Sequence, residues 1–328
     1  MVLMLNYDII IVGGGASGML AAMAAKKSGA QNILIIERED QLGGSLNQLI
    51  HTGFGIYTFG ENFTGPEYAQ RLIDEVRRLN IEVKLKSLVI EVSKEKTVTV
   101  VNEEGINEFK CKAIVLAMGC REKPRGAVNI PGSKCAGIFT VGTTQKFINM
   151  EGYMPGKQVV MVGSSDIGLL MARNMVLEGA NVKAVLEPMS YASGSERNIE
   201  ECIKDFNIPL KLGYTIVDIL GHDRVEGVVI SRVDNNLIPI VDTEERISCD
   251  TLLLSAGLLP ESELALKTGI LTSNVTGGII VDRNQKTNIE GIFACGDVLY
   301  VHDLEEDISI ESISAGNNAA RVILKKFK

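Results

Sequence analysis

Two short segments of the sequence combine glycine spacing and apolar flanks in a way that suits binding of a phosphate group. The first spans residues 13–18, reads GGGASG and directly follows an apolar run at residues 9–12. In a turn of the form G-x-G-x-x-G, the first glycine allows the tight bend, the second lets the backbone approach a pyrophosphate, and the third lets the next helix pack closely. The N-terminus of that helix presents free N–H groups and a positive dipole end to the phosphates. Residues 13–18 are therefore a candidate dinucleotide-binding turn.

A carboxylate follows this turn at the spacing expected of a ribose-binding residue. Glu37 comes directly after a second apolar run at residues 33–36, and 37 − 13 = 24 residues separate it from the first glycine. A carboxylate at this place can accept hydrogen bonds from the ribose hydroxyls. The alternative is a glycine-rich turn with an unrelated surface glutamate, which would not require the spacing or the flanking strand and helix.

The second segment, residues 163–168, reads GSSDIG and repeats the plan with one irregularity. Ser165 stands where the second glycine would be usual, while Glu187 keeps the spacing, because 187 − 163 is again 24. The serine adds a Cβ where backbone approaches a pyrophosphate, although its hydroxyl can donate a hydrogen bond to phosphate. Glu187 would repel a 2′-phosphate, which favours NAD over NADP. Another adenine nucleotide, or a duplicated domain that has lost its nucleotide, remain alternatives for this segment.

The elements that must position these turns are strands and helices in alternation. Continuous apolar runs are typical of parallel strands covered on both faces. Such strands are predicted at residues 9–12, 33–36, 113–117, 159–162, 182–186, 251–254 and 291–294, and helices at 17–27, 66–79, 166–177 and 310–326. A small antiparallel sheet is predicted from 82–91, 97–102 and 107–111, and further strands from 214–220, 226–232 and 237–241. The pattern predicts an α/β fold with two Rossmann-like three-layer nucleotide-binding domains.

Composition excludes several classes of function. The 328 residues carry a net charge of −8 without a basic block, which argues against nucleic acid as a partner. No apolar stretch reaches about 18 residues, so we expect no transmembrane segment, and the apolar first residues read as a strand rather than a signal peptide. These features favour the cytoplasm. The six cysteines and three histidines lack metal-ligand spacing, so no metal site is expected.

Two further motifs extend the pattern across the chain. They are Ala117-Met-Gly119-Cys-Arg121 and Gly291-Ile-Phe-Ala-Cys-Gly296-Asp297. With the two turns, they resemble the two-dinucleotide-binding-domain flavoproteins of the pyridine nucleotide–disulfide oxidoreductase superfamily, and the length resembles the thioredoxin-reductase-like branch. The resemblance implies an FAD-binding domain from residues 1–122 and 252–328, with an NAD(H)-binding domain, residues 123–251, inserted into it.

The turns and the resemblance together assign site residues. For FAD they are Gly13, Gly15, Ala16, Ser17, Gly18, Glu37, Arg38, Gly43, Gly44, Gln48, Ala117, Gly119, Gly296 and Asp297. For NAD(H) they are Gly163, Ser165, Asp166, Ile167, Gly168, Glu187 and Gly257. The resemblance implies that Asp297 holds the ribityl and phosphate region of FAD. It also implies that the last helix points its N-terminus, near residues 310–312, at the flavin, where its dipole would stabilise the reduced form.

A narrower resemblance concerns function. The segments LGGSLNQ at 42–48, HTGFG at 51–55, DIGLLMA at 166–172 and VHDL at 301–304 are similar to FAD/NAD subunits of opine oxidase, hydrogen cyanide synthase, dye-linked proline dehydrogenase and glycerol-3-phosphate-dehydrogenase-like complexes. It implies an electron-transfer subunit of a hetero-oligomer, whose partners are a substrate-oxidising flavoprotein and, as a further candidate, a small iron–sulfur protein. The alternatives are a free-standing NADH dehydrogenase or oxidase and a scaffold subunit with structural nucleotides.

Catalytic side chains are less well indicated than cofactor-binding ones. The sequence has no C-x-x-C, so dithiol catalysis, as in the disulfide reductases of the superfamily, is not expected. His51 and His302 are the titratable candidates near the motifs, and each is expected to be a structural hydrogen-bonding residue rather than a proton shuttle. Hydride transfer requires stacked rings rather than an acid–base pair, so the absence of a nucleophile–base arrangement is consistent with flavin chemistry.

Overall fold

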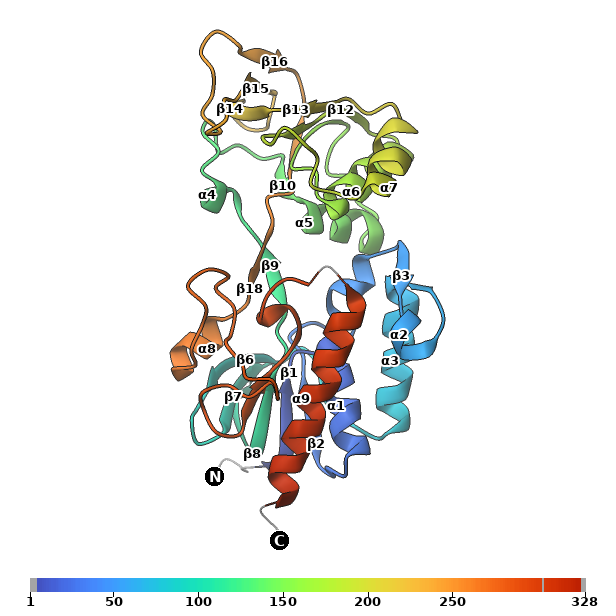
Figure 1. Cartoon of the computed structure of the whole chain (residues 1–328), viewed down its shortest axis with the longest axis vertical. Helices are drawn as coiled ribbons and strands as arrows, with labels where there is room; N and C mark the ends of the chain where they lie inside the picture. The colour runs from blue at the N-terminus through green and yellow to red at the C-terminus, as the bar shows by residue number, and fades with distance from the viewer. Residues whose placement is uncertain (1–4, 303, 326–328) are drawn as a thin grey trace. The chain divides into compact units, whose positions relative to one another are not determined.

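The computed structural model describes residues 5–302 and 304–325 and divides into two compact units. Unit 1 comprises Met1–Arg121 and Leu258–Lys328, and unit 2 comprises Glu122–Gly257, so the second unit is inserted in the first (Figure 1). The chain therefore returns to unit 1 later than residue 252, because β17 (Thr251–Leu254) pairs within the sheet of unit 2.

The sheet of unit 1 has a parallel centre. Its order is β5-β2-β1-β8-β7-β6, with β19 also paired to β8. The strands of the parallel part are β5 (Glu82–Lys84), β2 (Ile33–Ile36), β1 (Leu5–Val12), β8 (Gly105–Leu116) and β19 (Ile292–Ala294). The apolar strands predicted at 9–12, 33–36 and 291–294 are confirmed.

The small separate antiparallel sheet predicted for unit 1 is wrong. The first half of β8 pairs with β7 (Thr97–Asn102), which pairs with β6 (Leu88–Val92), while the second half of β8 pairs with β19. The predicted strands 107–111 and 113–117 are therefore one strand, and β5 is parallel to β2. Burial changes along β8 from alternating to continuous, which makes one strand look like two in the sequence.

Alternate side chains of the parallel strands point to opposite faces, which gives unit 1 its layers. On one face, Ile9 and Ile11 pack with α1 (Ala16–Lys27), α3 (Gly65–Arg78) and α9 (Glu305–Lys325), and these helices lie together in Figure 1. On the other face, Ile10 and Val12 pack against the β6–β7 hairpin and α8 (Glu263–Thr268). Three layers therefore enclose the sheet.

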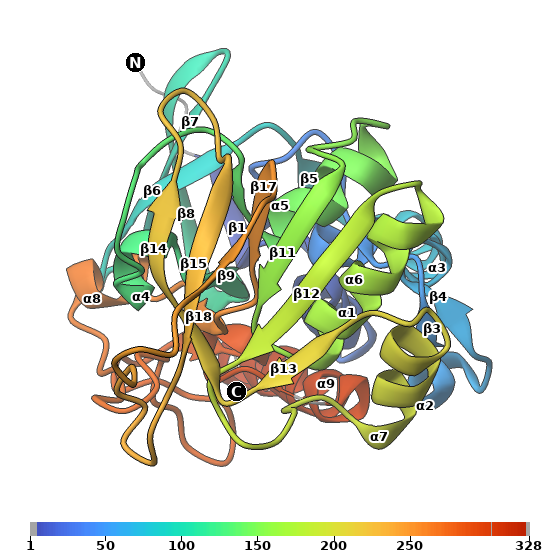
Figure 2. The same ribbon diagram turned by 90° about the horizontal axis from the view of Figure 1, so that it is seen from above.

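Unit 2 repeats this plan. Its parallel sheet has the order β10-β17-β11-β12-β13. The sheet packs on one face against α6 (Asp166–Leu177) and on the other against the β14–β15–β16 sheet, an arrangement visible in Figure 2. The strands are β10 (Ile138–Thr140), β11 (Gln158–Val162), β12 (Asn181–Glu187), β13 (Leu210–Leu212), β14 (Tyr214–Leu220), β15 (Gly227–Arg232) and β16 (Glu245–Ile247). The predicted α/β class with two Rossmann-like three-layer units is confirmed.

The remaining elements are short. They are η1 (Gly44–Gln48), β3 (Thr52–Phe54), α2 (Ile56–Phe59), β4 (Phe63–Thr64), β9 (Cys120–Glu122), α4 (Arg125–Val128), α5 (Val141–Gln145), η2 (Lys146–Met150), α7 (Glu196–Asn198), η3 (Ile199–Lys204), β18 (Leu258–Pro260) and η4 (Gly296–Val298). Within the described part of the chain, no helix is both long and apolar enough to cross a membrane.

Two predicted boundaries are wrong. Residues 237–241 do not form a strand, because Leu237 has a φ of +60° and Pro239 has no N–H to pair; the third strand is β16. The last helix begins at Glu305 rather than near residues 310–312, and its first turn contains three acidic residues, which suit a helix N-terminus. Residue 326, the predicted end of this helix, lies outside the described residues.

Candidate nucleotide-binding sites

The glycines of the first turn differ in why they are needed. Gly13 has a φ of +107°, and a Cβ on it would lie 2.3 Å from the carbonyl oxygen of Ala117. A Cβ on Gly18 would lie 1.9 Å from the carbonyl oxygen of Gly13. Gly15 instead has an ordinary φ of −74°, and a Cβ there would meet no atom closer than the Cα of Gly44, at 4.0 Å. The fold therefore requires glycine at 13 and 18, whereas the open space at Gly15 suits a bound pyrophosphate.

Glu37 is buried beside this turn and is held by backbone donors. Its Oε2 accepts a hydrogen bond from the N–H of Gly14 at 2.7 Å, and its Oε1 accepts one from the N–H of Glu39 at 2.9 Å. A carboxylate fixed in this way keeps further lone pairs for ribose hydroxyls. The neighbouring Arg38 is exposed and pairs with Glu39 at 3.8 Å.

Other predicted FAD residues gather around the first turn. Gly43 donates its N–H to the carbonyl oxygen of Gly14 at 2.9 Å, which brings the following loop, with Gly44 and the half-buried Gln48, toward the turn. A Cβ on Gly296 would lie 2.1 Å from Oγ of Ser17, next to Ala16, so the late motif also adjoins the turn. Gly119 follows Ala117 with a φ of +71° and open space at its Cα.

His51 makes contacts that are local to β3 rather than with this group. Its Nδ1 lies 3.0 Å from the carbonyl oxygen of Thr52, and its ring lies 5.2 Å from the ring of Phe54. These contacts give His51 a structural environment.

His302 lies next to Asp297 in a buried charged cluster. Its side chain is 1% exposed, its Nδ1 lies 3.1 Å from Oδ1 of Asp297, and its Nε2 lies 3.0 Å from Oε2 of Glu311. Burial opposes protonation, but contacts with the two carboxylates outweigh it and raise the pKa of His302 from 6.5 to about 9. The imidazole is therefore charged at neutral pH.

This cluster predicts that stability depends on pH through His302. Because the folded pKa lies above the unfolded one, the contribution is fully present below pH 6.5 and is lost as pH rises through about 9. It amounts to on the order of 3 kcal/mol. We expect the unfolding free energies of wild type and His302→Gln, measured in urea, to converge between pH 7 and pH 10. A constant difference over this range would contradict the charged state.

The second turn has the same backbone geometry as the first. Gly163 has a φ of +93°, and a Cβ on it would lie 2.1 Å from the carbonyl oxygen of Ser255, the counterpart of Ala117. Ser165 caps α6, since its Oγ accepts the N–H of Gly168 at 3.3 Å and lies 2.7 Å from Oγ of Ser255. The irregular serine thus has a structural role that glycine cannot fill.

Glu187 repeats the arrangement of Glu37 with one added donor. Its Oε2 accepts the N–H of Ser164 at 3.1 Å and the hydroxyl of Ser164 at 2.6 Å, and its Oε1 accepts the N–H of Met189 at 3.0 Å. Two turns with carboxylates fixed by corresponding backbone donors fit two nucleotides. Gly257, with a φ of +90°, follows Ser255 as Gly119 follows Ala117.

The loop after β12 contacts the second turn, which the sequence did not indicate. Asp166 Oδ1 accepts hydrogen bonds from the N–H and hydroxyl of Ser195, both at 2.8 Å, and from Nδ2 of Asn198 at 2.6 Å. Burial raises the pKa of Asp166, but these hydrogen bonds outweigh it and lower the pKa below its usual value. Ile167 beside it is 36% exposed. Ser255 could have been found by aligning the two repeats, whereas the contacts of Ser195 and Asn198 are tertiary.

The chain is similar to curated oxidoreductases. It is 25% identical to the flavoprotein component of alkyl hydroperoxide reductase from Staphylococcus aureus (strain Mu50) over 96% of this chain and 58% of that protein. It is 28% identical to the CoA-dependent NAD(P)H sulfur oxidoreductase of Pyrococcus abyssi (90% and 64%) and 24% identical to the HcnB component of hydrogen cyanide synthase from Pseudomonas protegens (81% and 60%). The chain spans about three fifths of the length of these relatives.

Solved structures share the fold. The thioredoxin reductase of T. acidophilum matches with a TM-score of 0.80 at 21% identity, over 97% of this chain and 99% of that one. L-proline dehydrogenase from P. horikoshii matches with a TM-score of 0.65 at 19% identity, over 100% of this chain and 57% of that one.

The family model described as pyridine nucleotide-disulphide oxidoreductase matches residues 7–320, which include both turns and the late motif. The chain therefore belongs to the pyridine nucleotide–disulphide oxidoreductase family, whose members bind FAD and NAD(P)H.

Proposed function

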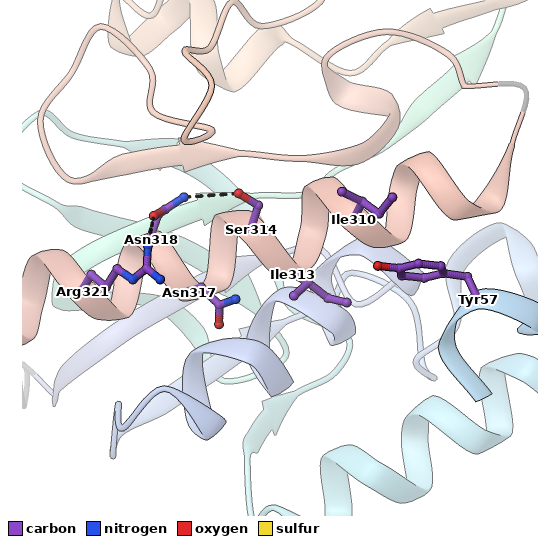
Figure 3. Close-up of a pocket in the computed structure, with 7 residues that line it drawn as sticks. All are labelled: Tyr57, Ile310, Ile313, Ser314, Asn317, Asn318 and Arg321. Atoms are coloured by element: carbon purple, nitrogen blue, oxygen red, sulfur yellow. Dashed lines mark hydrogen bonds between the residues drawn. The ribbon is translucent and has the colours of Figure 1, made fainter. Parts of the chain in front are cut away.

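We propose that this chain is the electron-transfer subunit of a multi-subunit dehydrogenase or oxidase, of the amine, opine, proline or glycerol-3-phosphate type. The observation that carries the proposal is a group of exposed apolar side chains where α2 packs against α9. Ile56 is 60% exposed, Tyr57 48% and Ile310 45%. In Figure 3 the ring of Tyr57 lies close to Ile310 and Ile313 at the edge of a pocket. Large apolar side chains gathered on a surface mark contacts with other proteins.

The same surface continues toward the predicted FAD residues along the chain. Tyr300 is 45% exposed and Leu304 is 60% exposed, and both lie in the segment that joins Asp297 to α9. A partner bound there would adjoin the segment that follows the late FAD motif. The names of two similar proteins, a hydrogen cyanide synthase subunit and an L-proline dehydrogenase, support this class of function.

In this proposal FAD binds in unit 1 and NAD(H) in unit 2. Bound FAD supplies the hydride and electron chemistry, and the protein supplies orientation and electrostatics. The turn at residues 13–18 holds the FAD pyrophosphate, Glu37 orients the adenosine ribose, and Asp297 accepts hydrogen bonds from the ribityl region. The turn at residues 163–168 and Glu187 do the same for the adenosine half of NAD(H).

The cysteines support a function other than dithiol exchange. Burial raises the pKa of Cys111 and Cys295 to about 12 and that of Cys249 to about 11, so these side chains stay thiols rather than reactive thiolates. Cys120 Sγ donates to Oδ2 of Asp297 at 3.7 Å. With no C-x-x-C in the sequence, no cysteine pair is arranged for the exchange that disulfide reduction requires.

Anaerobic reduction and turnover of the purified chain test the proposal. We expect stoichiometric NADH to bleach the bound FAD, because both nucleotide turns have intact geometry. We also expect the isolated chain not to oxidise amine, opine, proline or glycerol-3-phosphate substrates until its partner is added. Flavin that NADH leaves oxidised would indicate a scaffold, and full turnover with NADH and a small acceptor alone would indicate a free-standing NADH dehydrogenase.

A further inference from the structure

We propose that His302 is a positioning residue of the FAD site, a buried imidazolium that fixes Asp297 and sets the net charge next to the flavin. The inference rests on the proposed placement of FAD in unit 1. Asp297 is the carboxylate that would meet the ribityl chain, and its side chain is 28% exposed, which leaves an open edge for a ligand. His302, by contrast, is enclosed and would act through Asp297.

Two hydrogen-bond donors of the same residue hold Asp297. The backbone N–H of His302 donates to Oδ1 at 3.2 Å, and the ring Nδ1 donates to the same oxygen at 3.1 Å. The other oxygen, Oδ2, accepts the Cys120 thiol at 3.7 Å. The carboxylate is therefore fixed before any ligand arrives, which lowers the entropic cost of binding.

The opposite side of the imidazole faces a second carboxylate. Nε2 of His302 lies 3.0 Å from Oε2 of Glu311 on α9, but the two are not aligned as a hydrogen bond, so the contact is mainly electrostatic. The other oxygen of Glu311 accepts the hydroxyl of Tyr300 at 3.1 Å. The ring of Tyr300 covers the imidazole at a centroid distance of 4.1 Å. His302 thus connects the late FAD motif to the last helix.

The charges of this group can be counted. The titratable groups that face His302 are Asp297 from η4, Glu311 from α9, and Tyr300, with Cys120 on the far side of Asp297; Asp307 acts on Tyr300. The imidazolium and the two carboxylates sum to +1 − 2 = −1. Removing the positive charge would leave −2 in a buried site and would disfavour the more negative, reduced form of a neighbouring flavin.

Charge-balanced variants separate an electrostatic role from a merely structural one. His302→Gln makes the group −2, Glu311→Gln makes it 0, and the double variant restores −1. We expect the midpoint potential of bound FAD to be highest in Glu311→Gln, lowest in His302→Gln, and close to wild type in the double variant. We expect His302→Gln to weaken FAD binding roughly ten- to hundredfold, measured by fluorescence titration, because a charge-assisted hydrogen bond to Asp297 is lost. The matched control is His222→Gln, which changes a histidine whose side chain is 96% exposed in unit 2.

Each outcome decides the question. Wild-type potential and FAD affinity in His302→Gln would overturn the proposal, as would a double variant whose potential departs further than either single variant. If His302→Gln fails to fold, NMR of the wild-type imidazole decides, since a neutral ring at pH 7 would also overturn it. Failure of NADH to bleach FAD in the wild type would count against the proposed function alone, because affinity and potential are measured without NADH.

Discussion

Gly15→Val is expected to yield a folded protein that has lost its FAD. The backbone at Gly15 has a φ of −74° and a ψ of −171°, which any residue can adopt, and a Cβ there meets nothing closer than 4.0 Å. The valine side chain would instead occupy the space where the pyrophosphate approaches the backbone. We expect FAD affinity to fall about a hundredfold or more, which corresponds to about 3 kcal/mol. The flavin content of the purified protein and FAD titration of the apoprotein measure this change.

The matched comparison is Gly13→Val. Gly13 has a φ of +107°, and a Cβ on it would lie 2.3 Å from the carbonyl oxygen of Ala117. This substitution should remove FAD by disrupting unit 1 itself, so circular dichroism and thermal unfolding should change along with colour. Gly15→Val should lose the colour and keep the thermal midpoint of the apoprotein. Full yellow colour in Gly15→Val would show that the cofactor does not bind at this turn.

Glu187→Arg is expected to weaken NADH relative to NADPH by roughly ten- to hundredfold. The carboxylate is 6% exposed and accepts hydrogen bonds from Ser164 and Met189, which fix it for the ribose hydroxyls. Arginine cannot accept these bonds or those of the ribose, and each lost charged hydrogen bond is worth roughly 1.5–3 kcal/mol. Its positive charge would at the same time favour a 2′-phosphate. The ratio of kcat/KM values for the two nucleotides is the readout, because general damage to unit 2 lowers both.

Two controls accompany this variant. Glu178→Arg makes the same charge change at an exposed position just after α6 and should leave the ratio unchanged. Ser164→Gly makes the second turn match the first, where Gly14 stands, and should retain the preference for NADH because the backbone N–H still reaches Glu187. An unchanged ratio in Glu187→Arg would remove this carboxylate from the nucleotide site.

The parts of the fold that repeat were predictable from the sequence. The strand, turn, helix and carboxylate recur with equal spacing, and both Glu37 and Glu187 accept the N–H of the second residue of their turn. This works because a β-α-β unit is built from contacts that are close in sequence. The same reasoning divided β8 into two strands, because one part of it is buried on one face and the other on both.

Tertiary contacts between distant segments could not be predicted in this way. His302 was a visible candidate, but its partner Glu311 became apparent only when α9 was found to begin at Glu305. The apolar residues 237–241 suggested a strand because hydrophobic runs usually mark one, yet Leu237 and Ile238 are exposed in a turn. Short-range patterns report burial on average and do not identify which buried groups meet.

Purification of the chain from its native cell under mild conditions tests the central claim most directly. The account predicts recovery in a fixed ratio with a second flavoprotein, in a complex that contains FAD, oxidises an amine, opine, proline or glycerol-3-phosphate, and exchanges electrons with NAD(H) through this subunit. Recovery of the chain by itself, with full NADH-dependent turnover of a small acceptor, would contradict it.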